Sequence, residues 1–207
     1  MSQIPKEIEK LYSTEFLNSI YVKLRWRLTK FEEIEEVIPK EGRILDLGCG
    51  FGILSNYLYL KSNKRKIIGL DYSKKRIANA KKTIRNKNLQ FKVSNLITEK
   101  IPKANCYVLI DFLHHIIRQH HNEILKKIFN SLETGGTLIF QEIDKKNTVK
   151  YYFTYLLDRT LNYGEKVYYL PAKEWEKILI ATGFKIKEIK RLDKNSLFPN
   201  ILFICTK

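Results

Sequence analysis

The chain has 207 residues, with 38 Lys and Arg against 22 Asp and Glu, so its formal net charge is +16. Hydrophobic residues make up 44% and aromatic residues 12% of the sequence, a globular composition that excludes a disordered or fibrous protein. No apolar run is long enough to span a membrane, and the charged N-terminal residues lack the apolar core of a signal peptide. Three widely spaced Cys exclude a disulfide framework. We therefore expect a cytoplasmic protein.

The first 39 residues are expected to form a helical cap. Apolar side chains recur at three- and four-residue steps between residues 4 and 38, which is the helical period. Ser13 or Thr14 is a candidate N-cap, and Pro39 ends the pattern. The main domain, residues 40–207, follows.

In the main domain short apolar strands alternate with helices. The predicted strands are 43–47, 66–71, 89–94, 104–111 and 137–143, and the predicted helices are 53–60, 73–85 and 119–133. This alternation is typical of βαβ units in a mostly parallel sheet. Unbroken apolar strands indicate burial on both faces of that sheet.

The C-terminal part differs from the βαβ pattern. A helix is predicted at 172–182, and the strands 184–192 and 198–206 are joined closely enough for an antiparallel hairpin. The predicted fold is therefore α/β, a doubly wound seven-stranded sheet, mostly parallel with an antiparallel last strand, and with helices on both faces.

An inserted segment, residues 145–170, contains half of the chain's twelve Tyr. Such a dense aromatic segment is expected to pack against another surface of the protein, of a partner or of a membrane. An active-site lid, an interface, a membrane-facing surface and a plain helical hairpin over the sheet edge all fit this composition.

A glycine-rich loop, residues 44–52 (ILDLGCGFG), follows the first strand and opens into a helix. Its glycines allow a tight turn and a close approach of a ligand to the backbone, and the helix adds N–H donors. Asp46 precedes the loop, and Asp71 ends the next strand, where a carboxylate can accept both hydroxyls of a ribose. A dinucleotide fingerprint would need Gly in place of Ile53 or Ser55, so hydride transfer is disfavoured, and no P-loop motif is present.

The spacing D-x-G-x-G-x-G resembles motif I of the class I S-adenosylmethionine (SAM)-dependent methyltransferases. Asp71 resembles the acidic residue of motif II, and residues 107–116 (YVLIDFLHHI) resemble motif IV of the small-molecule and lipid-modifying subgroup, which includes quinone-biosynthesis methyltransferases. Residues 132–140 (LETGGTLIF) resemble the turn before strand five. The resemblance covers residues 40–207 and implies methyl transfer from SAM by direct displacement, with S-adenosyl-L-homocysteine as the product.

The same resemblance implies which residues hold SAM. Gly48 and Gly50 would pass against its methionine part, and Asp46 would orient its amino group. Asp71 would hold the ribose hydroxyls, and Tyr72 would pack beside the adenine. Asn95 and Leu96 stand where the family usually has Asp, and the Asn95 side-chain oxygen can still accept from the adenine amino group. Asp111 would lie beside the sulfonium. Arg27 could pair with the SAM carboxylate or equally with a lipid phosphate.

Candidates for catalysis follow strands four and five. His114 and His115 lie at the carboxyl edge of the sheet, where one of them can act as general base toward a hydroxyl acceptor; the alternative, favoured for His115, is packing beneath the cofactor. Glu142 and Asp144 are further candidates, with a solvated strand end as the alternative. Two more His follow at 120 and 121, but no Cys or H-x-x-x-H pattern accompanies them, so no metal is expected.

The acceptor is expected to be a small molecule or a lipid. Asp111-Phe-Leu-His114 differs from the D/N-P-P-F/Y/W motif of amino-group methylases of DNA and RNA, so nucleic acid is the less favoured partner. The rival interpretation is a basic RNA-directed methyltransferase, or a silent nucleic-acid-binding domain whose patch is formed by residues 64–66 and 74–85. Trp26 and Tyr21, among basic residues, could also place the first helix peripherally on the anionic inner membrane face.

Overall fold

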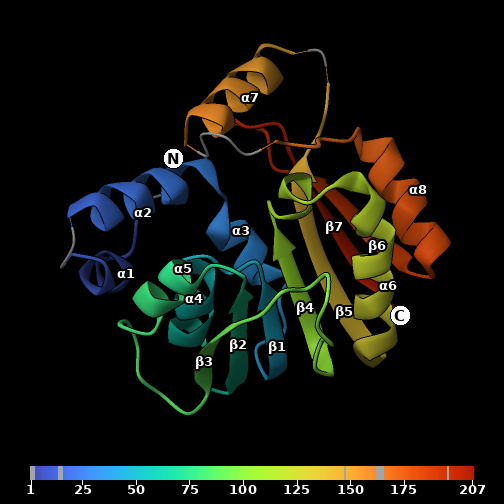
Figure 1. The fold of residues 1–207 in the computed structure, drawn as a ribbon. Helices are drawn as coiled ribbons and strands as arrows, with labels where there is room; N and C mark the ends of the chain where they lie inside the picture. The colour runs from blue at the N-terminus through green and yellow to red at the C-terminus, as the bar shows by residue number, and fades with distance from the viewer. Residues whose placement is uncertain (1–2, 14–15, 147, 162–165, 195) are drawn as a thin grey trace. The chain divides into compact units, whose positions relative to one another are not determined.

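The computed structural model describes residues 3–13, 16–146, 148–161, 166–194 and 196–207. Two compact units divide the chain, Met1–Asn95 and Leu96–Lys207. The strands form one seven-stranded sheet in the order β3-β2-β1-β4-β5-β7-β6 (Figure 1). No helix in the described part of the chain is both long and apolar enough to cross a membrane.

The first unit contains three parallel strands and five helices within its described residues. The elements are α1 (Lys6–Leu11), α2 (Phe16–Leu28), α3 (Phe31–Glu36), β1 (Gly42–Leu47), α4 (Ile53–Lys61), β2 (Arg65–Asp71), α5 (Lys74–Ala80) and β3 (Leu89–Val93). Strand β1 pairs with β2 and β2 pairs with β3, both in parallel. The predicted βαβ units are therefore confirmed.

The second unit contains the other four strands. Its elements are β4 (Ala104–Ile110), the short turns η1 (Leu113–His115) and η2 (Arg118–His120), α6 (His121–Ser131), β5 (Leu132–Ile143), α7 (Val149–Leu161), α8 (Ala172–Thr182), β6 (Lys185–Arg191) and β7 (Asn200–Thr206). Strand β4 pairs with β5 in parallel, and β7 runs antiparallel to both β5 and β6. The predicted fold class, including the antiparallel end of the sheet, is confirmed.

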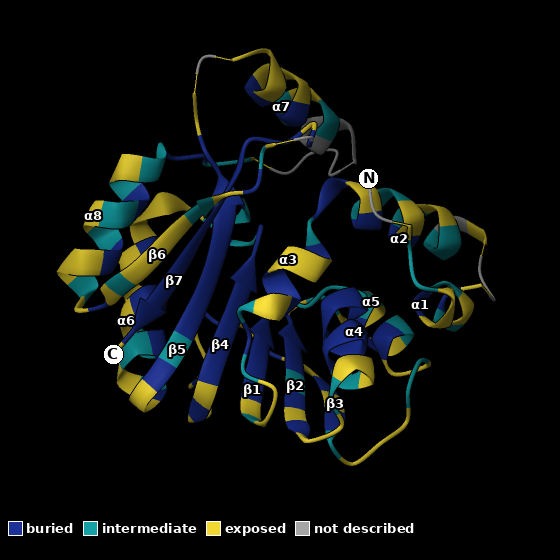
Figure 2. Ribbon diagram, turned by 180° about the vertical axis from the view of Figure 1, so that it is seen from behind, coloured by how far each residue is buried: buried dark blue, intermediate teal, exposed yellow. Residues whose placement is uncertain are grey.

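The strands β1, β4, β5 and β7 are dark blue along most of their length in Figure 2, which shows their burial. Continuous burial of β1, β4 and β7 matches the unbroken apolar runs that the sequence displays there. The edge strand β6 is mostly exposed, and only Ile186 and Lys190 in it are half-buried.

Two predicted boundaries are wrong for local reasons. Helix α5 begins with the predicted Ser73 cap, which accepts from the Arg76 N–H, but it ends at Ala80 instead of Arg85. The Thr83 hydroxyl there donates to the Ala80 carbonyl, a side-chain bond that competes with helix continuation. Strand β5 begins at Leu132, not at residue 137, and its irregular start passes through Gly135 with φ +74°.

The described residues of the N-terminal segment form three helices, α1 to α3. Thr14 lies outside the described residues, and the Ser13 hydroxyl donates to the Lys10 carbonyl at the end of α1. Trp26 is only 1% exposed, because its ring packs on Phe31 and edge-on against Tyr57 at centroid distances of 5.2 and 5.0 Å. Trp26 is therefore unavailable to the membrane contact that the sequence suggested for this helix.

Arg65 contradicts the predicted basic patch at residues 64–66. Its side chain is fully buried, and its guanidinium donates to the carbonyls of Pro39, Leu58 and Ile38 at 2.7, 2.8 and 3.1 Å. An ion pair of 2.8 Å to Glu35 completes its contacts. Arg65 therefore joins β2 to α4 and the end of α3 inside the first unit and is not available to a polyanion.

Candidate functional site

The glycine-rich loop between β1 and α4 is fastened to the end of β2. The N–H groups of Gly48 and Cys49 both donate to the Leu70 carbonyl, at 2.7 and 3.0 Å. Gly48, Gly50 and Gly52 have φ of 75°, 54° and 76°, in the left-handed region that residues with a Cβ rarely adopt. The backbone thus reverses direction within five residues, as the sequence motif predicts.

Gly50 and Gly52 meet different surroundings. A Cβ on Gly52 would lie 2.6 Å from the Phe91 ring, so this glycine permits close packing of the loop on β3. A Cβ on Gly50 would meet no atom within 4 Å. The loop therefore borders open space at Gly50, where a ligand can approach the backbone closely.

Asp71 is placed beside this open part of the loop. Its Oδ2 accepts from the Gly50 N–H at 2.9 Å, and its Oδ1 accepts from the Ser73 N–H at 2.8 Å. These two bonds fix the orientation of the carboxylate. Each oxygen retains a further lone pair, so the group can still accept the two hydroxyls of a ribose.

Asp46, at the end of β1, is buried and accepts from the Ser55 hydroxyl at 2.6 Å. Burial raises the pKa of Asp46 from 3.8 to about 6, and the nearby Asp71 carboxylate adds to the rise. Ser55 lies in the first turn of α4. The sequence motif contains Asp46 but not this partner, whose position three residues beyond the last glycine carries no distinct signal.

The loop is also held by Tyr12 at the C-terminal end of α1, a contact that no local sequence pattern indicates. The Tyr12 hydroxyl donates to the Phe51 carbonyl at 2.9 Å and accepts from the Asn56 amide at 2.8 Å. The Tyr21 ring of α2 packs on Phe51 at 5.0 Å between centroids. The first two helices therefore bear directly on the conformation of the glycine-rich loop.

The structure brings Asp46, Gly48, Gly50 and Asp71 together at the β1 and β2 ends. Three other predicted cofactor residues of this unit lie outside that cluster. Their side chains are exposed: Arg27 on α2, Tyr72 after β2 and Asn95 after β3. Leu96 and Asp111 belong to the second unit, and both are buried.

Asp111 makes a sharp turn after β4. Its φ of +50° is unusual for a residue other than Gly, although Asp adopts this region more readily than most. Its Oδ1 accepts from the Gln141 amide at 3.0 Å, and its N–H donates to the Gln141 carbonyl at 3.0 Å. These contacts hold the turn between β4 and η1, which contains His114 and His115.

His114 and Glu142 form a buried pair. His114 Nδ1 lies 2.6 Å from Glu142 Oε2, and Oε1 of the same carboxylate accepts from the N–H groups of Phe112 and Leu113 at 3.2 and 2.7 Å. Glu142 is 0% exposed, so its interpretation as a solvated strand end is wrong. With the carboxylate beside Nδ1, the neutral imidazole carries its proton there and has its lone pair on Nε2.

The other three His residues have different surroundings. The His115 ring is half-buried and lies 4.2 Å from that of His114, which is the more deeply buried of the two. His121 stacks on Trp175, faces the Ile116 carbonyl at 2.8 Å, and has its pKa lowered by burial. His120 lies near Glu123. Among the described residues, no group of three or more metal-ligating side chains is found.

Asp144 is structural. It is buried, its Oδ1 accepts from the Ala172 N–H at 2.8 Å, and its Oδ2 lies 3.0 Å from Arg191 and 3.1 Å from Lys146. These contacts fix the start of α8 against the end of β5. The prediction of a solvated strand end is wrong for Asp144 as well.

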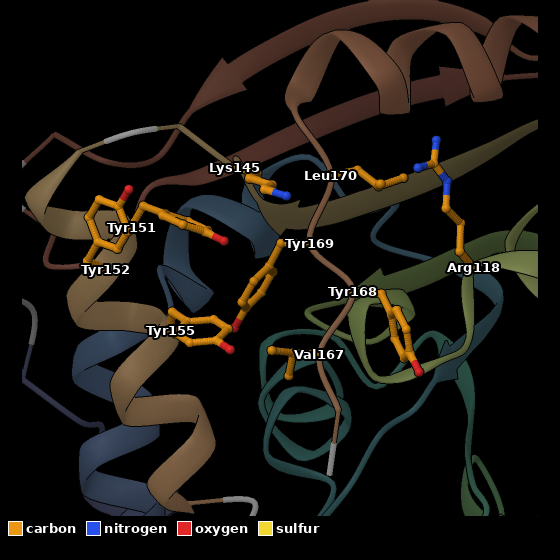
Figure 3. A pocket seen from close by; sticks show the side chains of 9 residues that line it. All are labelled: Arg118, Lys145, Tyr151, Tyr152, Tyr155, Val167, Tyr168, Tyr169 and Leu170. Carbon is orange, nitrogen blue, oxygen red and sulfur yellow. The ribbon is translucent and has the colours of Figure 1, made fainter.

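A pocket of about 470 Å³ lies in the second unit (Figure 3). Five tyrosines, two basic residues and two aliphatic residues line it, and all come from η2, α7, Lys145 and the segment 167–170. The described part of the Tyr-rich insertion contains one helix, α7, and residues 166–171 are not helical, so the helical-hairpin interpretation is wrong there. The Tyr168 N–H donates to the His114 carbonyl at 2.7 Å, and the Tyr169 ring lies 4.8 Å from the His114 ring.

Comparison with known proteins identifies the family of the chain. A family model described as a methyltransferase domain matches residues 21–189. Carboxy-S-adenosyl-L-methionine synthase of Actinobacillus pleuropneumoniae is 30% identical over 52% of this chain and 47% of that protein. O-methyltransferase 12 of Dictyostelium discoideum is 28% identical over 80% of this chain and 44% of that protein. The chain spans about half the length of the curated relatives it matches.

Solved structures share the fold. The S-adenosylmethionine-dependent methyltransferase from Mesorhizobium loti superposes with a TM-score of 0.70 at 16% identity, over 85% of this chain and 96% of that one. Human N-acetylserotonin methyltransferase in complex with SAM also gives a TM-score of 0.70 at 16% identity, over 94% of this chain and 59% of that one.

Proposed function

The chain belongs to the methyltransferase domain family, and we propose that it transfers a methyl group from SAM to a small-molecule acceptor. The observation that carries the proposal is the glycine-rich loop, in which Gly50 borders open space and donates its N–H to the Asp71 carboxylate. A loop with these properties, between a strand end and a helix, fits a ligand that carries a ribose.

SAM, when bound, would supply an electrophilic methyl group on a sulfonium. Gly48 and Gly50 would let its methionine part approach the backbone, and Asp71 would accept its ribose hydroxyls. Asp46 would orient its amino group. The exposed Tyr72, Asn95 and Arg27, together with Leu96 and Asp111, are the remaining proposed cofactor residues.

In the second unit, His114 is the proposed general base for a hydroxyl acceptor. Glu142 holds the Nδ1 side of the ring, so Nε2 would take the proton from the acceptor as it is methylated. Glu142 is thereby a positioning residue, itself oriented by two backbone N–H groups. His115, whose ring contacts that of His114, is proposed to shape the same site. The similarity to an O-methyltransferase supports a hydroxyl acceptor.

A lipid or quinone-like acceptor is the finer alternative. One face of α7 exposes four apolar residues at helical spacing, with exposed fractions of 45–87%: Val149, Tyr152, Phe153 and Leu156. Such a face, on a chain of net charge +16, supports peripheral contact with an anionic membrane through α7 in place of Trp26. Phe153→Glu should abolish sedimentation with phosphatidylglycerol vesicles if this contact exists, and absence of wild-type binding at low salt would exclude it.

A nucleic-acid partner has less support. The net charge of +16 favours polyanions in general, but Arg65 is buried and cannot contribute to the predicted patch. Lys64 and Lys66 remain exposed beside it.

The proposal is tested by SAM binding and product analysis. Asp71→Asn should weaken SAM binding at least tenfold by calorimetry, while Asp193→Asn, a matched change at a surface ion pair, should leave it within twofold. Mass spectrometry should then detect S-adenosyl-L-homocysteine as the product. A carboxylated SAM derivative would instead indicate the activity named for the synthase relatives, and equal SAM affinity of both variants would contradict the assigned site.

A further inference from the structure

The pocket of the second unit has a composition that is uncommon for a solvated surface. Its five tyrosines come from two segments, three from α7 and two from residues 167–170. Figure 3 shows the rings of Tyr155 and Tyr169 converging, with Tyr151 close by. The Tyr151 ring meets Tyr169 edge-on at 5.9 Å and lies 6.4 Å from Tyr155. Tyr151, Tyr152, Tyr155 and Tyr169 therefore form one connected aromatic cluster, and Tyr168 lies apart from them in Figure 3.

Backbone contacts fix the segment that supplies Tyr168 and Tyr169 to the pocket. The Lys145 N–H donates to the Leu170 carbonyl at 3.2 Å, and the Tyr168 N–H donates to the His114 carbonyl at 2.7 Å. The Tyr169 ring lies against His114 while it also lines the pocket. The pocket is therefore adjacent to the His114–Glu142 pair within the same unit.

The charge of the lining has one sign. Two of the nine lining residues, Arg118 and Lys145, are basic, and none is acidic. Arg118 is paired at 2.7 Å with Glu174, which is not part of the lining. Burial raises the pKa of Tyr151, so this hydroxyl stays protonated at neutral pH and adds no negative charge.

Size and composition together indicate the ligand class. A volume of about 470 Å³ suits a molecule of one or two rings. Tyrosine faces and edges favour a flat aromatic group, because aromatic pairs gain from stacked and edge-on contacts. Lys145 and Arg118 favour a carboxylate or a similar anion at the rim.

We propose that this tyrosine-lined pocket, which adjoins His114 through Tyr168 and Tyr169, binds an aromatic carboxylate and is the acceptor subsite. This inference rests on the proposed function only for the transfer step. The binding of an aromatic anion to this pocket does not depend on SAM and can be tested without it.

The test uses three probes on the full chain without SAM: 4-hydroxycinnamate, its neutral methyl ester, and 3-cyclohexylpropionate, which keeps the carboxylate but lacks the ring. Calorimetry should detect saturable binding of 4-hydroxycinnamate, with affinity at least fivefold above that of either analogue. An equal affinity for the ester would overturn the role of the two basic residues. An equal affinity for the cyclohexyl acid would overturn the role of the tyrosines.

Variants locate the binding to this pocket. Lys145→Gln should weaken 4-hydroxycinnamate binding about fivefold, whereas Lys166→Gln, in the same insertion but outside the lining, should leave it within 1.5-fold. Glu174→Gln should strengthen binding, because it releases Arg118 from its ion pair. Equal effects of Lys145→Gln and Lys166→Gln would mean non-specific attraction and overturn the proposed site.

The same titrations separate this inference from the proposed function. Binding of SAM without binding of any aromatic anion would overturn the pocket assignment and leave methyl transfer intact. Binding of 4-hydroxycinnamate by a chain that does not bind SAM would overturn the proposed function and leave the pocket assignment intact.

Discussion

Replacement of Gly50 by Ala tests whether the glycine-rich loop serves a ligand or only a turn. Gly50 has φ +54°, and a Cβ there would meet no atom within 4 Å. The chain offers a matched control in Gly135, which has φ +74°, equally open surroundings, and a position in β5 of the second unit. The two substitutions therefore introduce the same backbone strain without a clash, and they differ in what occupies the space beside them.

The magnitude follows from the backbone conformation. A residue with a Cβ in the left-handed region costs about 1–2 kcal/mol, so both variants should lose about that much unfolding free energy. For a chain of this length each kcal/mol lowers Tm by about 2–4 °C. If SAM lies against Gly50, the new methyl group displaces it, and binding should weaken at least tenfold, or about 1.4 kcal/mol. Gly135→Ala should keep wild-type SAM affinity.

Thermal unfolding and calorimetric titration with SAM measure the two effects separately. The expected result is a similar fall in Tm for both variants, with a loss of SAM affinity confined to Gly50→Ala. Wild-type affinity in a folded Gly50→Ala variant would refute the assignment of this loop, and an equal loss of affinity in both variants would show that general destabilisation is the cause.

Three other predictions address the buried polar groups. Glu142→Gln should lower kcat about 100-fold or more with little change in Tm, because the amide would donate to Nδ1 of His114 and place the ring proton on Nε2. A kcat within threefold of wild type in steady-state assays would exclude His114 as the base. Arg65→Met should lower the unfolding free energy measured in urea by about 3–5 kcal/mol, since Glu35 and the carbonyls that accept from Arg65 lose a buried partner. The control Lys64→Met should lower it by under about 0.5 kcal/mol. Similar values for the two variants would contradict the described contacts. The folded-state pKa of Asp46 is raised from 3.8 to about 6, so its protonated form contributes stability below pH 4 that is lost as pH rises through 6. Asp46→Asn should therefore gain about 3 kcal/mol of unfolding free energy relative to wild type between pH 4 and 7.5. A stability difference that does not change with pH in urea unfolding would contradict this.

The sequence predicted the sheet and the glycine-rich loop because both depend on local patterns. Short apolar runs separated by helices define the strands, and left-handed turns at Gly48 and Gly50 demand glycine wherever they occur. Asp71 was found for the same reason, since it ends a strand at a fixed distance along the chain. The cap at Ser73 likewise needs only its neighbours within one helical turn.

Contacts between distant residues could not be predicted in this way. The sequence identified His114 and Glu142 separately, but their 2.6 Å pairing depends on the parallel register of β4 and β5. Helical periodicity indicated apolar positions in α2 without showing that Trp26 would pack on Tyr57 of α4. Arg65 looked like part of a basic surface because nothing local marks the three carbonyls that surround its guanidinium.

Methyl transfer to a small molecule can be measured by incubating the chain with methyl-labelled SAM and a cell extract, and then separating lipid, aqueous small-molecule, RNA and protein fractions. We expect label in a small molecule, in the aqueous or the organic fraction, and we expect this label to disappear with the Asp71→Asn variant. Label in RNA, or label that persists in Asp71→Asn at the wild-type level, would contradict this expectation.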